Sequence, residues 1–176
     1  MKTGKIENEL DFERALITDR KLRKLSKENN KYKNIRKELR DLIEIYENEN
    51  WAQNSIISDK KIKESDSAEL ISEKENIFIQ RRKKLIKQKL KELELTQQDF
   101  GKILGHHNKS YISELMNGVS AFSLKDLVII NRLLKIELTD LIPTFLSQSD
   151  MDYISKSVEK LKNPNLKLNN DEFVLV

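Results

Sequence analysis

Polar and charged side chains that can bind anions and nucleic-acid bases gather in one stretch of this 176-residue chain. Three of its four glycines, Gly101, Gly105 and Gly118, fall in that stretch. Lysine can donate to guanine, glutamate can accept from cytosine, and amides and hydroxyls can bond to phosphates. The function is therefore expected here, with Gln97, Asn108, Lys109, Ser110, Tyr111, Glu114 and Asn117 as the candidate residues.

The sequence offers no set of residues suited to catalysis or metal binding. It has no cysteine, which excludes thiol nucleophiles, disulfides and cysteine-based zinc sites. Its only histidines, His106 and His107, are adjacent and have no acidic residue at ligand spacing. No nucleophile, base and orienting group occur together. We therefore expect no enzyme activity, no cofactor and no metal, in a protein suited to a reducing cytoplasm.

Composition and charge favour an all-α protein with a basic middle segment. Four glycines and two prolines are too few for the tight turns of an all-β or Rossmann-type fold. Residues 79–146 carry 12 basic and 7 acidic side chains, net +5, whereas residues 1–78 carry 17 of each. No apolar run approaches the roughly 20 residues of a membrane helix. A soluble, unexported protein with an anionic partner is expected.

Two short helices joined by a turn are predicted around the glycines. Thr96 to Asp99 is close to a capping box, which predicts a helix over 97–104. Gly105 can adopt the left-handed conformation that ends helices. A turn over 106–108 then leads to a second helix over 109–116.

The pattern of helix caps continues along the chain. Asn117-Gly118 ends the second short helix, and Ser123 to Asp126 opens a third. Two short helices joined by a glycine-containing turn and braced by further helices are typical of a helix-turn-helix DNA-binding domain. The expected apolar positions are Phe100, Ile103, Leu104, Ile112, Leu115, Met116, Leu124, Leu127, Val128, Ile130, Leu133, Leu134, Leu138, Leu141 and Ile142.

The stretch from Leu95 through Gly118 to Leu127 resembles the Xre family of repressors and, within it, the HigA-type antitoxins. The run Leu39–Glu47 is similar to a segment that precedes the DNA-binding domain of those antitoxins. The resemblance implies a repressor of its own operon that binds operator DNA and neutralises an mRNA-cleaving toxin by holding it. A stand-alone Xre-type regulator and a helical adaptor without DNA binding are the alternatives.

The resemblance also implies roles for individual side chains. Gln97 lies at the start of a helix, where free amides and the helix dipole favour a phosphate. The second helix is expected to lie in the major groove with three side chains facing outward to the bases. These base-contacting residues are Lys109, Ser110 and Glu114, while Asn108, Tyr111 and Asn117 complete the DNA-binding set.

Two features depart from the family pattern. The turn of His106 to Asn108 is about one residue longer than usual. These repressors commonly have Lys or Arg directly after Asn-Gly, where it can meet a phosphate, but here Val119 to Phe122 follows Gly118. The basic run over 81–91 is the expected substitute source of phosphate contacts.

The N-terminal part predicts two amphipathic helices, over about 5–27 and 30–49. Because tryptophan and tyrosine are enriched at binding hot spots, this region is the expected toxin-binding part. For Trp51 itself, packing against the local core is the favoured interpretation, and an aromatic anchor for a partner is the alternative. The candidate toxin contacts are Leu39, Leu42, Tyr46 and Trp51.

Four segments follow from these patterns: an N-terminal helical region over 1–52, a polar linker over 53–67, a five-helix helix-turn-helix domain over 68–146, and a C-terminal helix and tail over 147–176. Ser67 is the expected cap of the long first helix of the domain. The apolar end Phe173–Val176 is expected either to pack on its own domain or to add to a partner.

A homodimer is expected on DNA, because one short recognition helix covers only a few base pairs. The segment Ile129 to Leu138 is apolar on more than one face and includes Ile136. It is therefore the expected dimer surface, with the N-terminal helices as the alternative.

Overall fold

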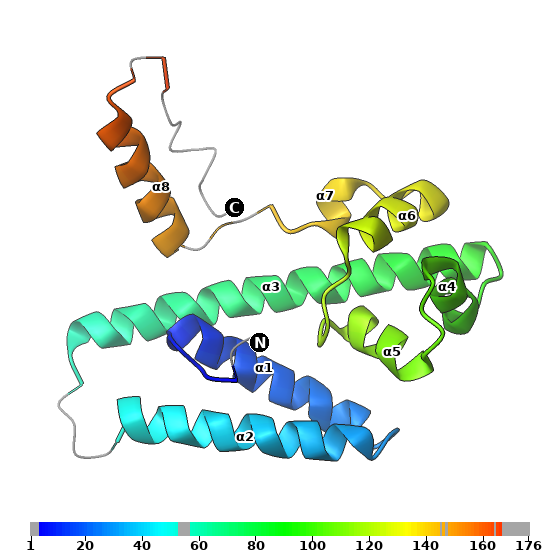
Figure 1. Cartoon of the computed structure of the whole chain (residues 1–176), viewed down its shortest axis with the longest axis horizontal. Coiled ribbons are helices and arrows are strands. Elements are labelled where there is room, and N and C mark those ends of the chain that lie inside the picture. The colour runs from blue at the N-terminus through cyan, green and yellow to red at the C-terminus, as the bar shows by residue number, and fades with distance from the viewer. Residues whose placement is uncertain (1–3, 53–56, 145, 147, 164, 167–176) are drawn as a thin grey trace. The chain divides into compact units, whose positions relative to one another are not determined.

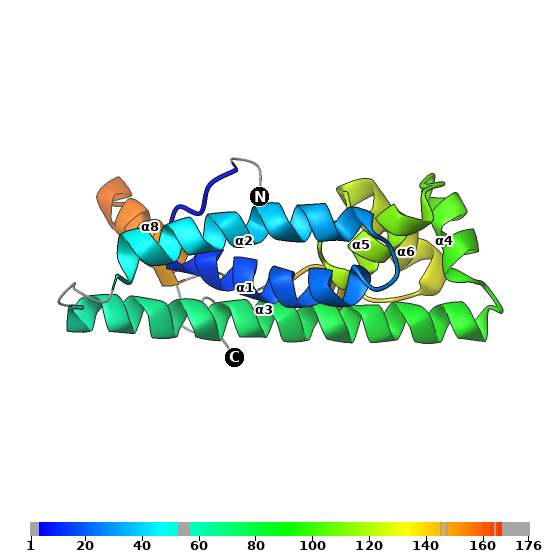
Figure 2. The same cartoon turned by 90° about the horizontal axis from the view of Figure 1, so that it is seen from below.

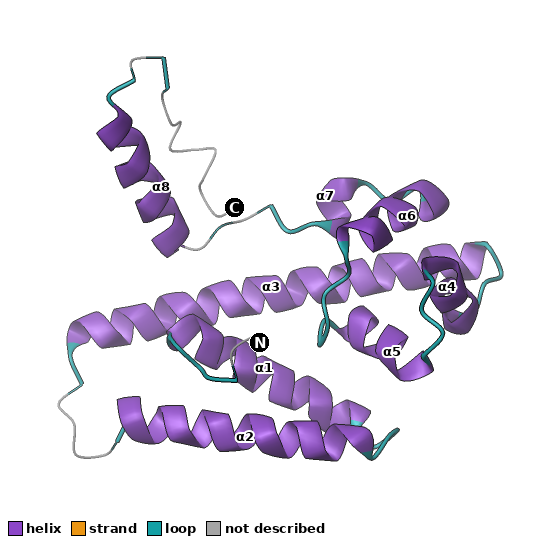
Figure 3. Ribbon diagram, in the orientation of Figure 1, coloured by secondary structure: helices purple, strands orange, loops and turns teal. Residues whose placement is uncertain are grey.

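The computed structural model describes residues 4–52, 57–144, 146, 148–163 and 165–166, and every regular element in these ranges is a helix (Figures 1 and 3). The predicted all-α fold is therefore confirmed. Residues Met1–Leu141 form one compact unit and Ile142–Val176 a second. The helices are α1 (Glu9–Leu25), α2 (Lys31–Asn50), α3 (Asp59–Glu92), α4 (Gln97–Leu104), α5 (Lys109–Asn117), α6 (Leu124–Leu134), α7 (Leu138–Leu141) and α8 (Gln148–Leu161).

Helices α1 and α2 form an antiparallel hairpin with its own apolar core, as the two amphipathic patterns predict. Asn8 caps α1 by accepting from the amide of Asp11 at 2.9 Å. The rings of Phe12 and Tyr46 stack with their centroids 5.0 Å apart. Burial of one apolar face on each helix stabilises the pair. The core consists of Ile6, Phe12, Ala15, Leu22, Leu25, Tyr32, Leu39, Ile43 and Tyr46, with Leu42 and Trp51 packed against it.

A buried carboxylate closes the far end of this hairpin. Glu9, only 3% exposed, accepts from the Tyr46 hydroxyl at 3.0 Å and from Nε1 of Trp51 at 3.1 Å. Nζ of Lys61 lies 3.8 Å from the carboxylate and 4.9 Å from the centre of the Trp51 ring. Burial and the bond to Glu9 raise the pKa of Tyr46. Trp51 therefore packs on its own hairpin, which agrees with the favoured interpretation of this residue.

The long helix α3 begins earlier than the sequence predicts. Its cap is Ser58, which accepts from the amide of Lys61 and places the start at Asp59 rather than beyond Ser67. The expected linker is thus helical from residue 59, and residues 53–56 lie outside the described ranges. Residues 59–67 are rich in Lys, Glu and Asp and almost free of apolar residues. They can continue a helix without burying a face, so they give no periodic signal.

Both the hairpin and the helix-turn-helix segment pack on α3. Figure 2 shows α1 between α2 and α3, and Arg14 of α1 donates from Nε to Glu75 of α3 at 2.8 Å. Further along α3, Arg81 pairs with Asp140 of α7 at 3.0 Å. One helix therefore carries both parts of the first unit.

The second unit contains α8, which matches the short amphipathic helix expected near Ile154 and Val158. The apolar end Phe173–Val176 lies outside the described residues. Among the described helices, none combines the length and apolar character needed to cross a membrane.

The Glu9 cluster yields a test of hairpin stability. We expect Tyr46→Phe to lower the free energy of unfolding by about 1–2 kcal/mol, because the buried carboxylate loses a donor while the ring stays in place. Urea unfolding followed by circular dichroism measures the change. Tyr153→Phe is the matched control, since Tyr153 is 73% exposed on α8. Equal stability of the Tyr46→Phe variant and the wild type would contradict the role given to this bond.

Candidate nucleic-acid interface

Helix α4 begins and ends as the sequence predicts. Thr96 and Asp99 form a full capping box: the Asp99 amide donates to Thr96 Oγ1 at 3.1 Å and the Thr96 amide to Asp99 Oδ2 at 3.2 Å. Hydrogen bonds from Thr96 lower the pKa of Asp99. Phe100 and Leu104 are buried, but Ile103 is 44% exposed, so only part of the predicted apolar face enters the core. The cap fixes where the free amides of α4 point.

The turn between α4 and α5 depends on two glycines. Gly105 has φ +83°, a left-handed conformation that side chains disfavour, and it ends α4. A Cβ on Gly101 would lie 2.6 Å from Cγ1 of Ile112 and 2.9 Å from the carbonyl oxygen of His106. Only glycine at this position lets α5 approach α4 so closely. The two short helices are therefore held at a fixed spacing.

Helix α5 is capped and anchored as a recognition helix requires. Oδ1 of Asn108 accepts from the amides of Ser110 at 2.9 Å and Tyr111 at 3.3 Å. The turn of His106 to Asn108 thus supplies the side-chain cap of α5. Gly118, with φ +67°, ends the helix. The predicted inward residues are all buried: Ile112, Leu115 and Met116.

The predicted DNA-contacting residues divide into two groups. Gln97, in the first turn of α4, is partly exposed, and Asn108 and Lys109 are exposed at the start of α5. Tyr111 is partly exposed and meets the ring of His106 edge-on, with centroids 5.1 Å apart. These side chains lie at one end of the helix pair, where they are open to a partner.

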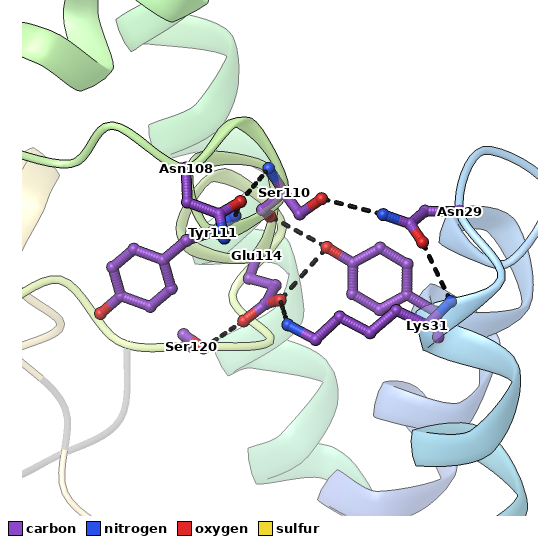
Figure 4. Close-up of polar contacts among 8 residues, drawn as sticks. Asn29, Lys31, Asn108, Ser110, Tyr111, Glu114 and Ser120 are labelled. Atoms are coloured by element: carbon purple, nitrogen blue, oxygen red, sulfur yellow. Dashed lines mark hydrogen bonds and ion pairs between the residues drawn. The ribbon is translucent and has the colours of Figure 1, made fainter.

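The second group, Ser110 and Glu114, contacts Asn29 in the turn between α1 and α2 and the first two residues of α2 (Figure 4). Glu114 is 8% exposed, so the prediction that it faces outward is wrong. Its Oε1 accepts from Nζ of Lys31 at 3.2 Å and from the Tyr32 hydroxyl at 3.2 Å. Oε2 accepts from the Ser120 hydroxyl at 3.1 Å. In this state the carboxylate has its partners inside the protein.

Ser110 is held from the same side. Its Oγ accepts from Nδ2 of Asn29 at 3.0 Å, and its carbonyl oxygen accepts from the Tyr32 hydroxyl at 2.9 Å. Burial, followed by the charge of Glu114, raises the pKa of Tyr32. We call this set of bonds, from Asn29, Lys31 and Tyr32 to Ser110 and Glu114, the turn–α5 contact.

A groove with basic walls runs beside the turn–α5 contact. Gln97, Lys109, Ser113 and Asn117 line one side of it. Its cationic residues come from three helices, and Glu28 is the one carboxylate among its described lining residues. We call it the basic groove; its cations are Arg20, Lys21 and Lys24 of α1, Lys83 and Lys87 of α3, and Lys109 of α5.

Charges from different helices act on one another across this groove. Burial, followed by the charge of Arg82, lowers the pKa of Lys21. Burial also lowers the pKa of Lys83, with Lys87 of the same helix and Lys24 of α1 as further causes. Like charges that disfavour each other's ionisation repel. Across the groove the charge of Lys24 therefore disfavours the charged form of Lys83, and an anion bound between them would favour it.

The basic run of α3 is only partly available for phosphates. Arg81 pairs with Asp140, and Arg82 donates to the carbonyl oxygen of Leu141 at 2.9 Å. Lys83 donates to Oδ1 of Asn117 at 2.6 Å, so Asn117 is occupied as well. Lys84, Lys87 and Lys91 are exposed and form no salt bridge with the described acidic residues.

In α6 and α7, part of the predicted apolar face is exposed, so the prediction is wrong for those residues. Ile130 and Leu134 are buried, whereas Leu124 is 73% and Val128 40% exposed. Leu138 is also exposed, and Leu141 is buried. The Ser123–Asp126 capping box is present, and Asp126 additionally bonds to Nε2 of His106 at 3.0 Å. The capping residue thus ties the α4–α5 turn to α6.

The sequence interpretation missed Asn29, Lys31 and Tyr32, which lie about 80 positions before their partners in α5. No local pattern marks them, because a polar turn between two amphipathic helices is ordinarily solvated. It also assigned partner contacts to residues that are not free: Leu39 and Tyr46 are each 6% exposed within the hairpin core. Regular apolar spacing at these positions indicated a core face.

Comparison with known proteins agrees with this geometry. Residues 86–141, from the end of α3 through α7, match the helix-turn-helix family. No curated protein and no solved structure matches the chain. The matched segment is the one that contains both capping boxes, the α4–α5 turn and α5. It is a helix-turn-helix domain of the Xre type, a DNA-binding regulatory class that is not typically catalytic.

Proposed function

Because residues 86–141 form an Xre-type helix-turn-helix domain, we propose that the protein is a transcriptional repressor that binds operator DNA through α4 and α5. The observation that carries this proposal is the capped α4–turn–α5 unit, in which Asn108 and Gly105 fix the entry of the recognition helix. The net charge of +5 over 79–146 favours an anionic partner.

Individual contacts follow from exposure and from position along the helices. Gln97 lies among the free amides at the start of α4 and donates to a phosphate. Lys109, exposed at the start of α5, reaches base edges. Asn108 and Tyr111 contact the DNA backbone beside it. Three further side chains can contact DNA only after they give up their present bonds within the protein: Ser110, Glu114 and Asn117.

The two kinds of contact have different signatures, which give a prediction. We expect Lys109→Ala to relax base discrimination at one operator position by about 1–3 kcal/mol, whereas Gln97→Ala weakens binding to all sequences about equally. Affinity should fall with salt, and only Lys109→Ala should reduce the salt dependence, because Gln97 is neutral.

Gel-shift titrations of the full chain at two salt concentrations, on duplexes from the DNA upstream of its own gene, measure these effects. Lys156→Ala, a lysine loss on α8, is the control for general charge. A wild-type affinity that does not change with salt concentration would favour the alternative of a helical adaptor without DNA binding. Equal losses from both substitutions on every sequence would remove Lys109 from base reading.

The resemblance to HigA-type antitoxins supports a second level of this proposal, in which the hairpin holds an mRNA-cleaving toxin. The end of α2 offers a surface with suitable chemistry. Between Asp41 and Asn50 the chain has no basic residue, and Ile45 is 51% exposed. An exposed apolar side chain within an acidic surface suits a basic protein partner. The exposed acidic residues around Ile45 are Asp41, Glu44, Glu47 and Glu49.

Charge reversal on α2 tests this partner. The candidate toxin is a small basic protein encoded beside this chain, and we expect co-expression of the two to restore growth that the toxin alone stops. Glu44→Lys/Glu47→Lys should weaken the complex at least about tenfold in a titration, since like charges then face each other. Glu159→Lys on α8 serves as control. If a neighbouring basic protein is harmless alone, or if it binds both variants alike, the antitoxin proposal fails and the stand-alone regulator takes its place.

We further propose that the repressor binds DNA as a homodimer. The expected surface needs revision, because Ile136 is only 5% exposed and belongs to the core. Leu124 and Val128 of α6 are exposed one helical turn apart and supply the apolar surface instead.

A polar substitution at each candidate surface distinguishes a dimer formed through α6 from one formed through the N-terminal helices. We expect Val128→Glu to convert the dimer into a monomer, because a carboxylate would be buried without a partner. Sedimentation equilibrium of the full chain measures this, with Ile45→Glu on α2 as the matched exposed control. A monomeric Ile45→Glu variant beside a dimeric Val128→Glu variant would place the interface in the N-terminal helices.

A further inference from the structure

The face of α5 that carries Ser110 and Glu114 is covered by the turn between α1 and α2. This inference rests on the proposed DNA binding: we propose that the turn and DNA compete for that face. In the closed state the hairpin covers this face, and α5 does not contact bases. DNA, or a ligand that draws the hairpin away from α5, shifts the protein to an open state in which α5 can contact bases.

The first argument is the completeness of the turn–α5 contact. Both carboxylate oxygens of Glu114 have partners, and Ser110 is bonded through its hydroxyl and through its carbonyl. Tyr32, which donates to both residues, is 2% exposed. Water has little access to these groups. A base edge could reach Ser110 or Glu114 only after the hydroxyl of Tyr32 and the amide of Asn29 had withdrawn.

The second argument is space. The DNA major groove, about 12 Å wide, admits one α-helix. A recognition helix must present its outer face to the groove floor, and here Asn29 and the first residues of α2 lie against the side of α5 that carries Ser110 and Glu114 (Figure 4). The closed arrangement and insertion of α5 into DNA are therefore mutually exclusive.

The third argument concerns how firmly the closed state is held. The hairpin core contains only residues of α1, α2 and the segment before α1, with Val119 packed at its edge. The turn–α5 contact itself is made of hydrogen bonds and one ion pair. Separating it leaves the hairpin core intact. An equilibrium between closed and open states therefore requires no unfolding.

Two features of the basic groove are unfavourable while the hairpin is docked. Lys24 of α1 and Lys83 of α3 both line it, and the charge of Lys24 adds to burial and Lys87 in lowering the pKa of Lys83. The buried Oδ1 of Asn76, in the lining of the same groove, has no hydrogen-bond donor among the described residues. Both features cost free energy in the closed state. The closed state is therefore held by the turn–α5 contact together with the packing of α1 on α3, where Arg14 bonds Glu75.

Removing those bonds from the hairpin side, with the DNA-binding domain unchanged, tests the competition. Asn29→Ala/Tyr32→Phe deletes two donors: the Asn29 amide that bonds Ser110, and the Tyr32 hydroxyl that is shared between the Ser110 carbonyl and Glu114. Apparent DNA affinity is the intrinsic affinity multiplied by the open fraction. With each bond contributing a factor of roughly five, we expect the full-length variant to bind the upstream duplex at least about tenfold more tightly than wild type.

The matched control is Tyr46→Phe, which removes the same hydroxyl from the other end of the hairpin, where it bonds Glu9. We expect no gain in DNA affinity from it. An equal gain from Tyr46→Phe would show that any loosening of the hairpin suffices, and would overturn the specific role of the turn–α5 contact.

The converse experiment closes the contact permanently. Because the chain has no cysteine, Asn29→Cys/Ser110→Cys introduces a single thiol pair at side chains that now bond at 3.0 Å. A short thiol-reactive cross-linker should abolish binding to the duplex, compared with the same variant before cross-linking. Binding that survives cross-linking would overturn the competition.

Amide hydrogen exchange in α5 separates this inference from the proposed function. Faster exchange in Asn29→Ala/Tyr32→Phe than in wild type shows, without DNA, that the turn covers α5. If exchange rises and no form of the protein binds duplex DNA, the proposed function fails while the covering role of the turn stands. If wild type and variant bind DNA equally and exchange equally, the DNA-binding function stands and the competition is overturned.

Discussion

A single uninterrupted helix, α3, is the constraint on which the first unit depends. It buries two separate patches: Ile71 and Ser72 in the part that carries Glu75, the partner of α1, and Ile86 and Leu90 in the part that begins the helix-turn-helix domain. Residues 71 and 86 are about 22 Å apart along a straight helix. An interruption between these patches would free the hairpin from the domain. Continuity of α3 instead sets the hairpin turn against α5.

The junction that results is polar, and that has energetic consequences. Burying the Glu114 carboxylate is costly unless it is fully bonded, and Lys31, Tyr32 and Ser120 supply the bonds. Such a junction specifies one geometry, because a shifted turn would leave a charge without partners. It also contributes less net free energy than an apolar junction of the same area, since each bond replaces one to water. The contact can therefore specify one geometry and still contribute little net free energy.

The sequence predicted the parts of the fold that local chemistry determines. The capping boxes at Thr96 and Ser123, the terminating glycines and the apolar spacing of the hairpin all act within a few residues, so they can be read without a structure. The start of α3 at Asp59 could not be read in this way, because a charged helix with no buried face has no period. Ser110 and Glu114 were expected to face outward from α5, but Glu114 is buried. Its burial depends on contacts far away in the sequence, which only the path of α3 determines.

The loop after Gly118 shows how the same contacts account for a departure from the family pattern. Where Xre-type repressors commonly have a basic residue for a phosphate, Val119 packs against the hairpin core and Ser120 bonds to Glu114. Phe122, 8% exposed, lies with its ring centre 5.2 Å from the Arg82 guanidinium. A lysine at residue 119 would place another charge against an apolar core, next to a groove that already holds six cations. The loop is thus built to complete the junction with the hairpin, and the positive charge that DNA requires is carried by the neighbouring helices instead.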